Sequence, residues 1–333
     1  MTLASRSLSR RSTLLAIAIA GALAASGAPE FARRGRAQGG GELRVGFQKG
    51  SASLLVLKSR SALEERLGPL GYGVTWTEFS SGPPLLEALN AGSLDFGSTG
   101  APPPIFAQAA GANLVYALAA APSPRTQAIL VPDGSAIASP TDLAGKKVAV
   151  AKGSSAHALL IWALRSVGLE WGAVEPVYLQ PADAKAAFEG GAVEAWSIWD
   201  PYYAAEEAAT GARTLITDEQ AGAPNRSFYL AARSFAEGHA EALALVREAL
   251  LETDGWAAEN PDEVAGLLAE QTGLDAAILR SVEERRVYGL ESVTEEIIAD
   301  QQALADVFFE LGLIPAKIDV STAFVELPEP DPV

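Results

Sequence analysis

The sequence contains no cysteine, one methionine and two histidines among its 333 residues. Without cysteine the chain cannot form a disulfide, use a thiol nucleophile, bind a metal through thiolates or carry a lipid on an N-terminal cysteine. The motifs GxSxG, HExxH and GxxxxGK[ST] are also missing. The carboxylates are scattered, and no base stands beside a nucleophile. We therefore expect a protein that is not an enzyme and that needs no cofactor and no metal.

Basic residues are scarce as well, because 25 Lys and Arg stand against 41 Asp and Glu and give a net charge of −16. The first 37 residues carry six arginines and one glutamate, so the rest of the chain has a net charge of −21. So acidic a protein is repelled by nucleic acid and by anionic membrane surfaces. An anionic ligand would have to be bound by local groups.

The N-terminal segment has the pattern of an export signal. Arg10 and Arg11 precede an uncharged run, residues 12–29, that is too short and too rich in alanine for a membrane span. "SRRSTLL" resembles a twin-arginine signal, although Thr13 replaces the usual Phe, so Tat and Sec export both stay open. We predict cleavage after Ala37 and a mature protein free in the periplasm. The alternative is a basic, disordered N-terminus.

Beyond this signal peptide, short apolar runs alternate with helical patterns, which is typical of an α/β fold with a mostly parallel sheet. Strands are predicted at 43–47, 74–79, 94–99, 114–120, 127–132, 147–151, 175–179, 194–199 and 227–233. Helices are predicted near 51–67, 83–91, 154–167, 181–190, 237–258, 261–271, 275–285 and 294–312. The pattern restarts at residue 147, which predicts two lobes.

The segment "GSSAH", Gly153 to His157, lies between a predicted strand and a predicted helix. Ser154 is the predicted N-cap, and Gly153 lets the backbone approach a ligand closely. The free amides of Ser155, Ala156 and His157, together with the helix dipole, would then form an anion site. The dipole also favours a neutral His157. The alternative for His157 is a ring that only caps or packs.

Three other stretches place candidate residues at the carboxyl ends of predicted strands, where ligands bind in open α/β sheets. They are "FQKGSAS" with Gln48 and Ser51, "FGSTGAPPPIF" with Ser98, Thr99 and Gly100, and "SIWDPYY" with Trp199 and Asp200. Asp200 is predicted to cap the helix that starts at Pro201, and Trp199 to offer an apolar wall to a ligand. The alternative for "FGSTGAPPPIF" is a plain connecting loop, and the alternative for Trp199 is a position in the core.

Several long stretches carry a family resemblance, among them "VGFQKG", "EALNAGSLDFGSTG", "VAVAKGSSAH", "YLQPADAKAAFEGGAVEAWSIWDPYY" and "SFYLAAR". They resemble the periplasmic aliphatic-sulfonate-binding components of ABC importers, within the nitrate, sulfonate and taurine-binding family. The likeness runs from about Glu42 to about Asp319. It implies a type II periplasmic binding protein fold, in which hinge closure traps a ligand between two α/β lobes with mixed, mostly parallel sheets.

The same resemblance implies lobe limits and a set of cleft residues. Lobe 1 would combine 42–130 with 230–333, lobe 2 would be 131–229, and the crossover strands would fall near 129–132 and 227–231. The candidate ligand-binding residues, from the motifs and the resemblance together, are Gln48, Ser98, Thr99, Gly100, Gly153, Ser154, Ser155, Ala156, His157, Trp199, Asp200 and Arg285. Arg285 would either reach the cleft or form a surface ion pair. Ala101 stands where close members of the family have Asp, which would make the cleft less negative.

The implied function is capture of alkyl- or arylsulfonates, or of sulfate esters, as a sulfur source, by a monomer that delivers them to a membrane permease and ATPase. Neutral donors would suffice, because a sulfonate stays ionised at physiological pH. Taurine, nitrate and a thiamine-pyrimidine precursor are alternative ligands. An enzyme on the same fold is a further alternative, with His157 as the available base.

Overall fold

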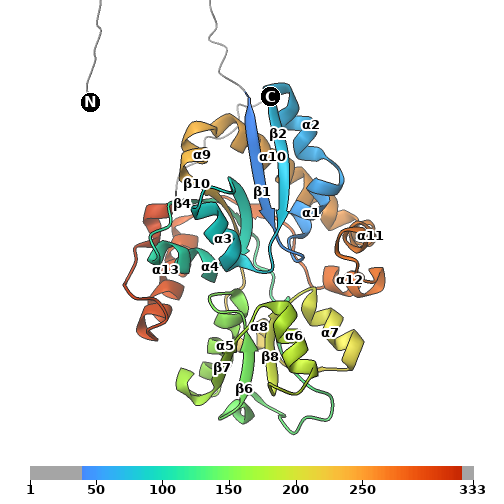
Figure 1. Ribbon diagram of the computed structural model, residues 1–333, viewed down its shortest axis with the longest axis vertical. Coiled ribbons are helices and arrows are strands. Elements are labelled where there is room, and N and C mark those ends of the chain that lie inside the picture. The colour runs from blue at the N-terminus through green and yellow to red at the C-terminus, as the bar shows by residue number, and fades with distance from the viewer. Residues whose placement is uncertain (1–39, 325–333) are drawn as a thin grey trace, which may run out of the picture. The chain divides into compact units, whose positions relative to one another are not determined.

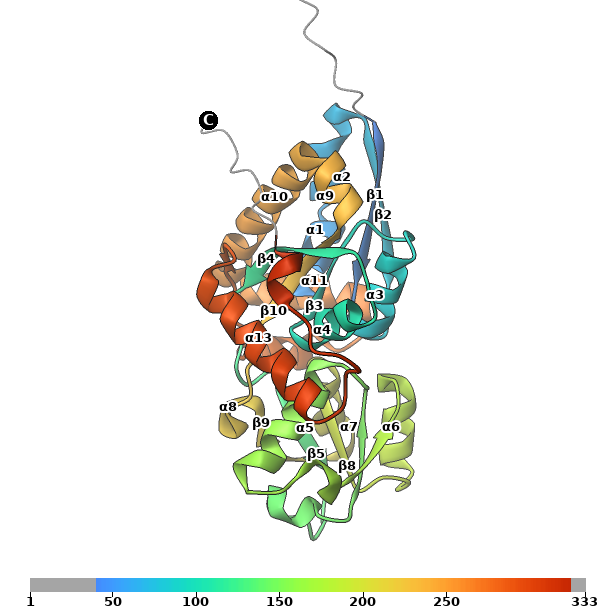
Figure 2. The ribbon, with the colours of Figure 1, turned by 90° about the vertical axis from the view of Figure 1, so that its left-hand side faces the viewer.

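The computed structural model describes residues 40–324, whose strands form two sheets with helices packed around them (Figure 1, Figure 2). The export signal predicted for the first 37 residues lies outside the described residues and stays a prediction. Within residues 40–324, no helix is both long enough and apolar enough to cross a membrane.

The six-stranded sheet and its helices make up what we call the first lobe. Its strand order is β11-β4-β10-β3-β1-β2. The strands are β1 (Gly41–Phe47), β2 (Tyr72–Glu78), β3 (Phe96–Gly100), β4 (Leu114–Ala120), β10 (Ser227–Ala232) and β11 (Leu290–Glu291). The helices are α1 (Ala52–Ser59), α2 (Ala62–Leu67), α3 (Gly82–Asn90), α4 (Pro102–Ala109), α9 (Arg233–Gly238), α10 (Ala240–Glu259), α11 (Pro261–Thr272), α12 (Ala276–Glu283) and α13 (Glu295–Glu310). The chain therefore enters this lobe twice.

The second lobe is built on a five-stranded sheet with the order β7-β6-β8-β5-β9. The strands are β5 (Gln127–Val131), β6 (Lys147–Val150), β7 (Glu175–Tyr178), β8 (Ala195–Trp199) and β9 (Arg213–Thr217). The helices are α5 (Ser155–Ser166), α6 (Pro181–Glu189), α7 (Tyr202–Thr210) and α8 (Asp218–Ala221). Four single-turn 3₁₀ helices complete the two lobes: Gly68–Leu70, Pro140–Leu143, Trp171–Ala173 and Val320–Ala323.

Both faces of the second sheet are buried, as its apolar strands predict. Along β5, Ile129 and Val131 pack into the core on the α5 side, whereas Ala128 and Leu130 pack into the core on the α6 side. This follows from the period of two in a strand, which sends successive side chains to opposite faces. Helices on both faces hold the carboxyl ends of β6 and β8 at one edge, where the loops to α5 and α7 begin.

The two-sheet α/β fold confirms the predicted fold class, but parallel pairing does not predominate. β1 pairs in parallel with β2 and β3, and β6 with β7 and β8, whereas β5 and β10 are antiparallel to both of their neighbours. β5 and β10 are the first strands after the chain crosses from one lobe to the other. They enter their new sheet from the side of the other lobe, which reverses their direction.

The chain crosses between lobes at 121–126 and 222–226, just before β5 and β10. The predicted crossovers near 129–132 and 227–231 therefore coincide with strands that already belong to a sheet. The predicted lobe limits at 130 and 230 likewise fall inside these two strands. Each crossover lies a few residues earlier because the apolar runs used for the prediction are the strands themselves.

Other elements differ from the sequence prediction as well, among them the short elements α8 and β11, which were not predicted. The helix expected over 51–67 is broken into α1 and α2, because Ser61 adopts a left-handed conformation with φ 52°. β9 was not predicted, although Ile216 and its neighbouring threonines are typical strand residues. None of these differences changes the positions of the strand ends that carry the candidate site.

Candidate functional site

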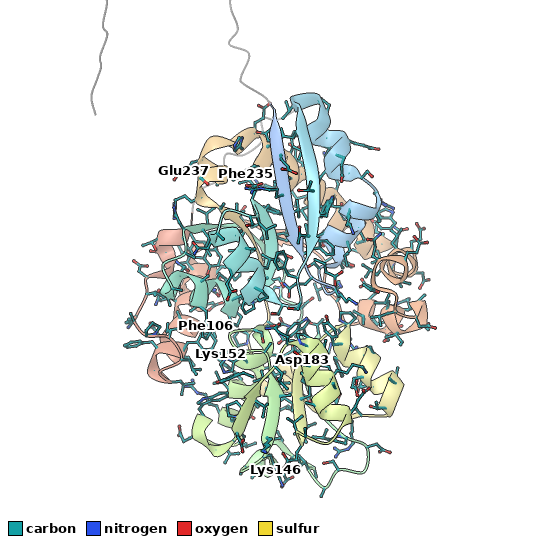
Figure 3. The ribbon with its side chains drawn as sticks, viewed as in Figure 1. Phe106, Lys146, Lys152, Asp183, Phe235 and Glu237 are labelled. Carbon is teal, nitrogen blue, oxygen red and sulfur yellow. The ribbon has the colours of Figure 1, made fainter. Side chains whose placement is uncertain are left out.

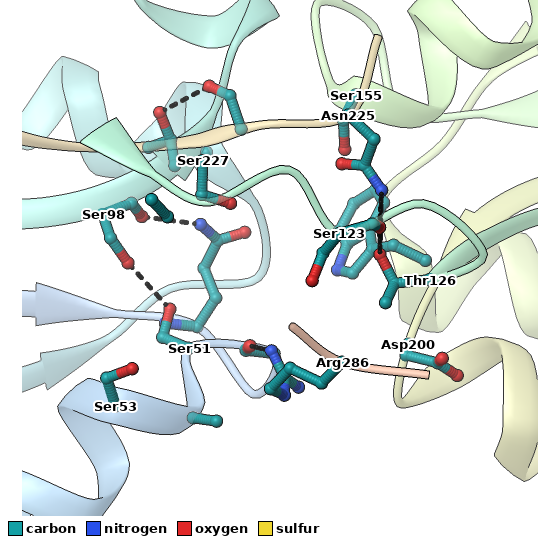
Figure 4. A pocket seen from close by; sticks show the side chains of 18 of the residues that line it. Ser51, Ser53, Ser98, Ser123, Thr126, Ser155, Asp200, Asn225, Ser227 and Arg286 are labelled. Carbon is teal, nitrogen blue, oxygen red and sulfur yellow. Dashed lines mark hydrogen bonds between the residues drawn. The ribbon is translucent and has the colours of Figure 1, made fainter. Parts of the chain in front are cut away.

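A pocket of about 140 Å³ lies between the two lobes, where their strand ends face each other (Figure 4). Its lining is mostly polar. From the first lobe it includes Gln48, Gly50, Ser51, Ser53, Ser98, Thr99, Gly100, Pro103, Ala120, Ser227, Tyr229, Asp254, Arg286 and Tyr288. From the second lobe and the crossovers it includes Ser123, Thr126, Gln127, Ser154, Ser155, Trp199, Asp200 and Asn225. Residues of all four predicted stretches thus meet at one pocket.

The first-lobe wall is a network of neutral hydrogen-bonding groups. Gln48 follows β1, and its side-chain amide donates to the Ser98 carbonyl over 3.0 Å. The Ser51 hydroxyl lies 3.2 Å from the Ser98 hydroxyl and accepts a hydrogen bond from the backbone N–H of Gln48 over 3.1 Å. Thr99 donates to the Gly100 carbonyl over 3.0 Å. These bonds fix the strand-end loops and leave the Gln48 side-chain oxygen and several hydroxyl lone pairs or protons for a ligand.

The second-lobe wall begins with the start of α5. Ser154 is its N-cap, as predicted, and its hydroxyl accepts from the His157 amide over 3.3 Å while donating to the Ala151 carbonyl over 2.7 Å. Ser154 is therefore occupied with the helix. The amides of Ser155 and Ala156 have no hydrogen-bond partner within residues 40–324. Of these two residues only Ser155 lines the pocket, so the helix presents Ser155 first.

The lobes approach each other closely at two glycines beside the pocket. A Cβ atom added to Gly100 would lie 3.0 Å from the Ser155 Cβ. One added to Gly50 would lie 2.8 Å from the Asp200 carbonyl oxygen, closer than a real contact allows. Glycine is therefore needed at Gly50 for the lobes to meet as they do here, whereas a side chain at Gly100 would require Ser155 to shift by a few tenths of an ångström.

His157 lies behind the pocket and does not line it. Its ring is fully buried among Phe106, Phe308, Trp171 and Tyr178, with ring centroids 5.0–6.3 Å away. Nδ1 accepts a hydrogen bond from the Gly153 amide over 3.1 Å, and Nε2 has no partner among the described residues. Burial, helped by the nearby charge of Lys152, lowers the pKa of His157 to about 4. The ring is therefore neutral, as predicted, and it packs between the lobes.

Gly153 and Ala156 also stand outside the lining. Gly153 has φ +74°, and a Cβ there would lie 3.3 Å from the ring of Phe106 in α4 of the first lobe. Figure 3 shows Phe106 at the level where the two lobes meet, with Lys152 close by. Gly153 thus provides a tight turn and a close interlobe contact. Ala156 is fully buried, and its carbonyl accepts from Ser197 over 2.8 Å.

Asp200 lines the pocket and is bonded to Arg285. Two guanidinium nitrogens of Arg285 donate to the two Asp200 carboxylate oxygens, at 2.9 and 3.0 Å. The guanidinium carbon lies 4.2 Å from the centre of the Tyr203 ring. Burial raises the pKa of Asp200 to about 6, although Arg285 opposes the rise. Arg285 itself does not line the pocket. It forms a largely buried ion pair between the first lobe and the second, so neither predicted alternative holds as stated: Arg285 does not line the pocket, and its pair with Asp200 is not a surface pair.

The predicted helix cap at Asp200 differs in detail. α7 begins at Tyr202, with Pro201 as the N-cap residue. The Asp200 side chain still accepts from the Ala204 amide over 3.1 Å. The carboxylate therefore binds the first turn from one residue further back than expected, through Oδ1, while both of its oxygens accept from Arg285.

Sequence reasoning missed the neighbouring arginine. Arg286 lines the pocket, and its side chain is 16% exposed. Its Nε donates to Glu283 over 3.0 Å and Nη1 to the Gly50 carbonyl over 3.2 Å, which leaves three of its five N–H groups for other partners. Two adjacent arginines at the end of a helix cannot be told apart in sequence, because only the packing of α12 decides which one faces the pocket.

The crossovers contribute a second group that the sequence did not reveal. The side-chain amide of Asn225 donates to the Ser123 carbonyl and to the Thr126 hydroxyl, both over 2.8 Å, and to Asp218 over 2.5 Å. Asp218 is fully buried and also accepts from the Arg125 amide over 2.7 Å. Asn225 thus ties the two crossovers together at the edge of the pocket.

Of the twelve predicted ligand-binding residues, the pocket brings eight together. They are Gln48, Ser98, Thr99, Gly100, Ser154, Ser155, Trp199 and Asp200. The other four, which support the wall from behind, are Gly153, Ala156, His157 and Arg285. Ala101 is buried beside the wall, and its carbonyl accepts from Gln301 over 2.7 Å.

Comparisons with known proteins identify relatives of this chain. Residues 80–264 match the family model "NMT1/THI5 like". A protein of Escherichia coli strain K12 whose name includes "aliphatic sulfonates-binding protein" is 45% identical over 282 residues, which are 84% of this chain and 86% of the relative.

Two solved structures share this fold. The alkanesulfonate-binding protein of Xanthomonas axonopodis pv. citri bound to MOPS is 39% identical with a TM-score of 0.82, over 85% of this chain and 98% of the other. The periplasmic aliphatic sulphonate binding protein of Escherichia coli is 43% identical with a TM-score of 0.78, over 88% of this chain and 94% of the other. The predicted resemblance is confirmed by these matches.

Proposed function

The chain belongs to the family of aliphatic sulfonate-binding proteins, and from this premise we propose that it captures alkyl- or arylsulfonates, or sulfate esters, in the pocket between its lobes. The bound compound would serve as a sulfur source and would pass to a membrane permease and its ATPase. We further propose that the protein works in the periplasm as a monomer and without catalysis. No histidine lines the pocket, which supports binding over acid–base chemistry.

The observation that carries the proposal is the start of α5, where Ser155 faces the pocket with an amide that has no partner in the described chain. A helix N-terminus favours an anion through its free N–H groups and its dipole. We place the sulfonate oxygens there, against Ser155 and the facing hydroxyls of Ser98 and Thr99. Hydrogen bonds to a charged acceptor are worth about 1.5–3 kcal/mol each, so a few of them hold an anion in this acidic chain.

The charge of Arg286 supports the same assignment. Arg286 is the one lysine or arginine among the described residues that line the pocket. Its free N–H groups would donate to an anion that enters between the lobes. Because Glu283 already pairs with it, Arg286 attracts an anion without leaving a bare charge when the pocket is empty.

The tail of the sulfonate would lie against the less polar part of the lining, which includes Trp199, Pro103 and Ala120. A cavity of about 140 Å³ has room for a head group and a short tail. Apolar contacts discriminate weakly between tails that differ by a methylene, so we expect several sulfonates to bind.

Isothermal titration of the purified protein with ethanesulfonate, butanesulfonate, benzenesulfonate, taurine and nitrate tests this function. We expect heat from several sulfonates and none from nitrate. Tight binding of nitrate without any sulfonate would contradict the proposal.

Ser155→Asp tests the position of the head group. It puts a fixed negative charge at the proposed anion position, so we expect butanesulfonate affinity to fall at least about 100-fold, which corresponds to about 3 kcal/mol. The fold should remain intact, because acidic residues are favourable in the first turn of a helix. Ser93→Asp is the matched control, since it adds the same charge to an exposed loop. A folded Ser155→Asp protein with unchanged affinity would show that the head group lies elsewhere.

A further inference from the structure

Asp254 is a buried carboxylate that lines the pocket and is only partly satisfied. It lies within the long helix α10 and is 5% exposed. Oδ2 accepts a hydrogen bond from the Gly289 amide over 3.0 Å. Oδ1 is buried and has no hydrogen bond of acceptable geometry within the described chain. A buried carboxylate oxygen without a donor is costly, so this one points to a group that is supplied from outside.

No cation of residues 40–324 forms an ion pair with Asp254. The charge of Arg286 acts on Asp254 without an ion pair, and two of the five Arg286 N–H groups donate to Glu283 and to the Gly50 carbonyl. The Ser53 hydroxyl lies beside Asp254 but leaves Oδ1 without a well-aligned bond. Burial raises the pKa of Asp254, and the Ser53 hydroxyl, the Gly289 amide and Arg286 only partly oppose this rise. Asp254 therefore has no cation bonded to it within the described chain, and its Oδ1 has no donor.

The surroundings of Asp254 form a second polar end of the pocket. Ser53 and Tyr229 line it beside Asp254, and all three belong to the first lobe. The proposed sulfonate position at Ser155 belongs to the second lobe. Figure 4 shows Ser53 and Ser155 on opposite sides of the pocket. A ligand whose head group lies against Ser155 can therefore direct its tail toward Asp254.

We propose that Asp254, with Ser53 and Tyr229, binds a cationic hydrogen-bond donor on the tail of the ligand, so that the preferred ligands are short zwitterionic aminoalkanesulfonates. This inference rests on the proposed function. The ammonium group would donate to Oδ1, where it supplies the missing hydrogen bond and the missing charge. Ala101 does not remove this recognition, because the carboxylate comes from α10 and not from the loop after β3.

Two ligands of equal length test the proposal directly. In 3-aminopropane-1-sulfonate the terminal group is an ammonium, and in butane-1-sulfonate a methyl group takes its place. We expect the wild-type protein to bind the amino compound at least about tenfold more tightly in titration calorimetry at pH 7.5, because a charge-assisted hydrogen bond is gained. This comparison needs no variant. Equal affinities, or a preference for butane-1-sulfonate, would overturn the inference and leave the proposed function standing.

Asp254→Asn identifies the group responsible. The amide oxygen can still accept from Gly289, but the charge is gone. The preference for 3-aminopropane-1-sulfonate should disappear, while the affinity for butane-1-sulfonate stays the same or rises. Asp95→Asn is the matched control, because Asp95 is a buried carboxylate of the same lobe that pairs with Arg44 and does not line the pocket.

Ser53→Ala is a second variant in case Asp254→Asn does not fold, and it should reduce the preference by a smaller factor. If Asp254→Asn binds both compounds with the wild-type ratio of affinities, Asp254 is not the recognising group. If wild-type protein binds neither compound, the proposed function itself fails, so the two failures are distinguishable.

Discussion

Lowering the pH should destabilise this protein through His157. The ring is fully buried between the lobes, with Phe106 of the first lobe and Trp171 of the second against it. Its Nδ1 accepts from the Gly153 amide, so protonation there would break that bond. Nε2 has no partner in the described chain that could accept from an imidazolium. The folded protein therefore holds the neutral ring, whereas the unfolded chain lets it take up a proton.

The size of the effect follows from the two pKa values. The pKa of His157 is about 4 in the folded protein, because of burial and Lys152, against 6.5 in an exposed chain. The unfolded state binds more protons between these values, so stability falls as the pH falls. The loss from this residue is below about 0.1 kcal/mol at pH 7.5, about 2 kcal/mol at pH 5 and about 3 kcal/mol below pH 4. A loss of 2 kcal/mol is a large part of the stability of a typical domain.

Urea unfolding followed by tryptophan fluorescence at pH 7.5 and pH 5.0 measures this loss in the wild type and in His157→Gln. The glutamine stays neutral at both values, so the variant should lose about 2 kcal/mol less than the wild type between them. Asp200, whose pKa is raised to about 6 by burial, acts in the opposite direction because its folded form takes up a proton first. It is common to both proteins and cancels in the comparison. Equal losses in wild type and His157→Gln would refute the reasoning.

Two further predictions concern the contacts between the lobes. Arg285→Gln leaves Asp200 buried without its cation and should cost about 3–5 kcal/mol in urea unfolding, whereas the double variant with Asp200→Asn should recover most of this. Costs that simply add in the double variant would contradict the pairing. Gly50→Ala puts a Cβ atom 2.8 Å from the Asp200 carbonyl, so butanesulfonate affinity should fall about tenfold or more while Gly73→Ala, which meets nothing within 4 Å, binds as the wild type. Unchanged affinity in Gly50→Ala would mean that ligand binding does not need this approach of the lobes.

Local sequence signals were enough to locate most of the fold. Alternating apolar strands and helical runs with glycine at their ends place β4 at 114–120 as predicted, and most other elements within a few residues. The break at Ser61 was not predicted, because neither glycine nor proline marks it. The direction of β5 and β10 could not be predicted either, since it depends on which lobe the chain comes from.

The candidate site was predictable where a local motif carried it. Ser154 and Ser155 belong to a strand, turn and helix that are contiguous in sequence, and the same holds for Ser98 and Thr99. Asp254 lies within α10 and Arg286 shortly after the end of α12, both far along the chain, and each is a single residue of an ordinary type for its surroundings. Nothing local distinguishes Asp254 from the many other acids. Its role depends on the burial of one oxygen beside the pocket, which only the tertiary structure defines.

Ligand binding and the approach of the lobes depend on the same residues. On one side of the pocket Ser81 of the first lobe donates to Gln180 of the second over 2.8 Å, and on another Arg285 pairs with Asp200. Within residues 40–324 two crossovers, tied by Asn225, connect the lobes. A ligand that spans from Ser155 to Asp254 would add its own contacts to these interlobe bonds. Its affinity then includes the free energy of bringing the lobes together, because a ligand shifts such an equilibrium by its difference in affinity for the two states. Substitutions that weaken an interlobe bond should therefore weaken binding even where they touch no ligand atom.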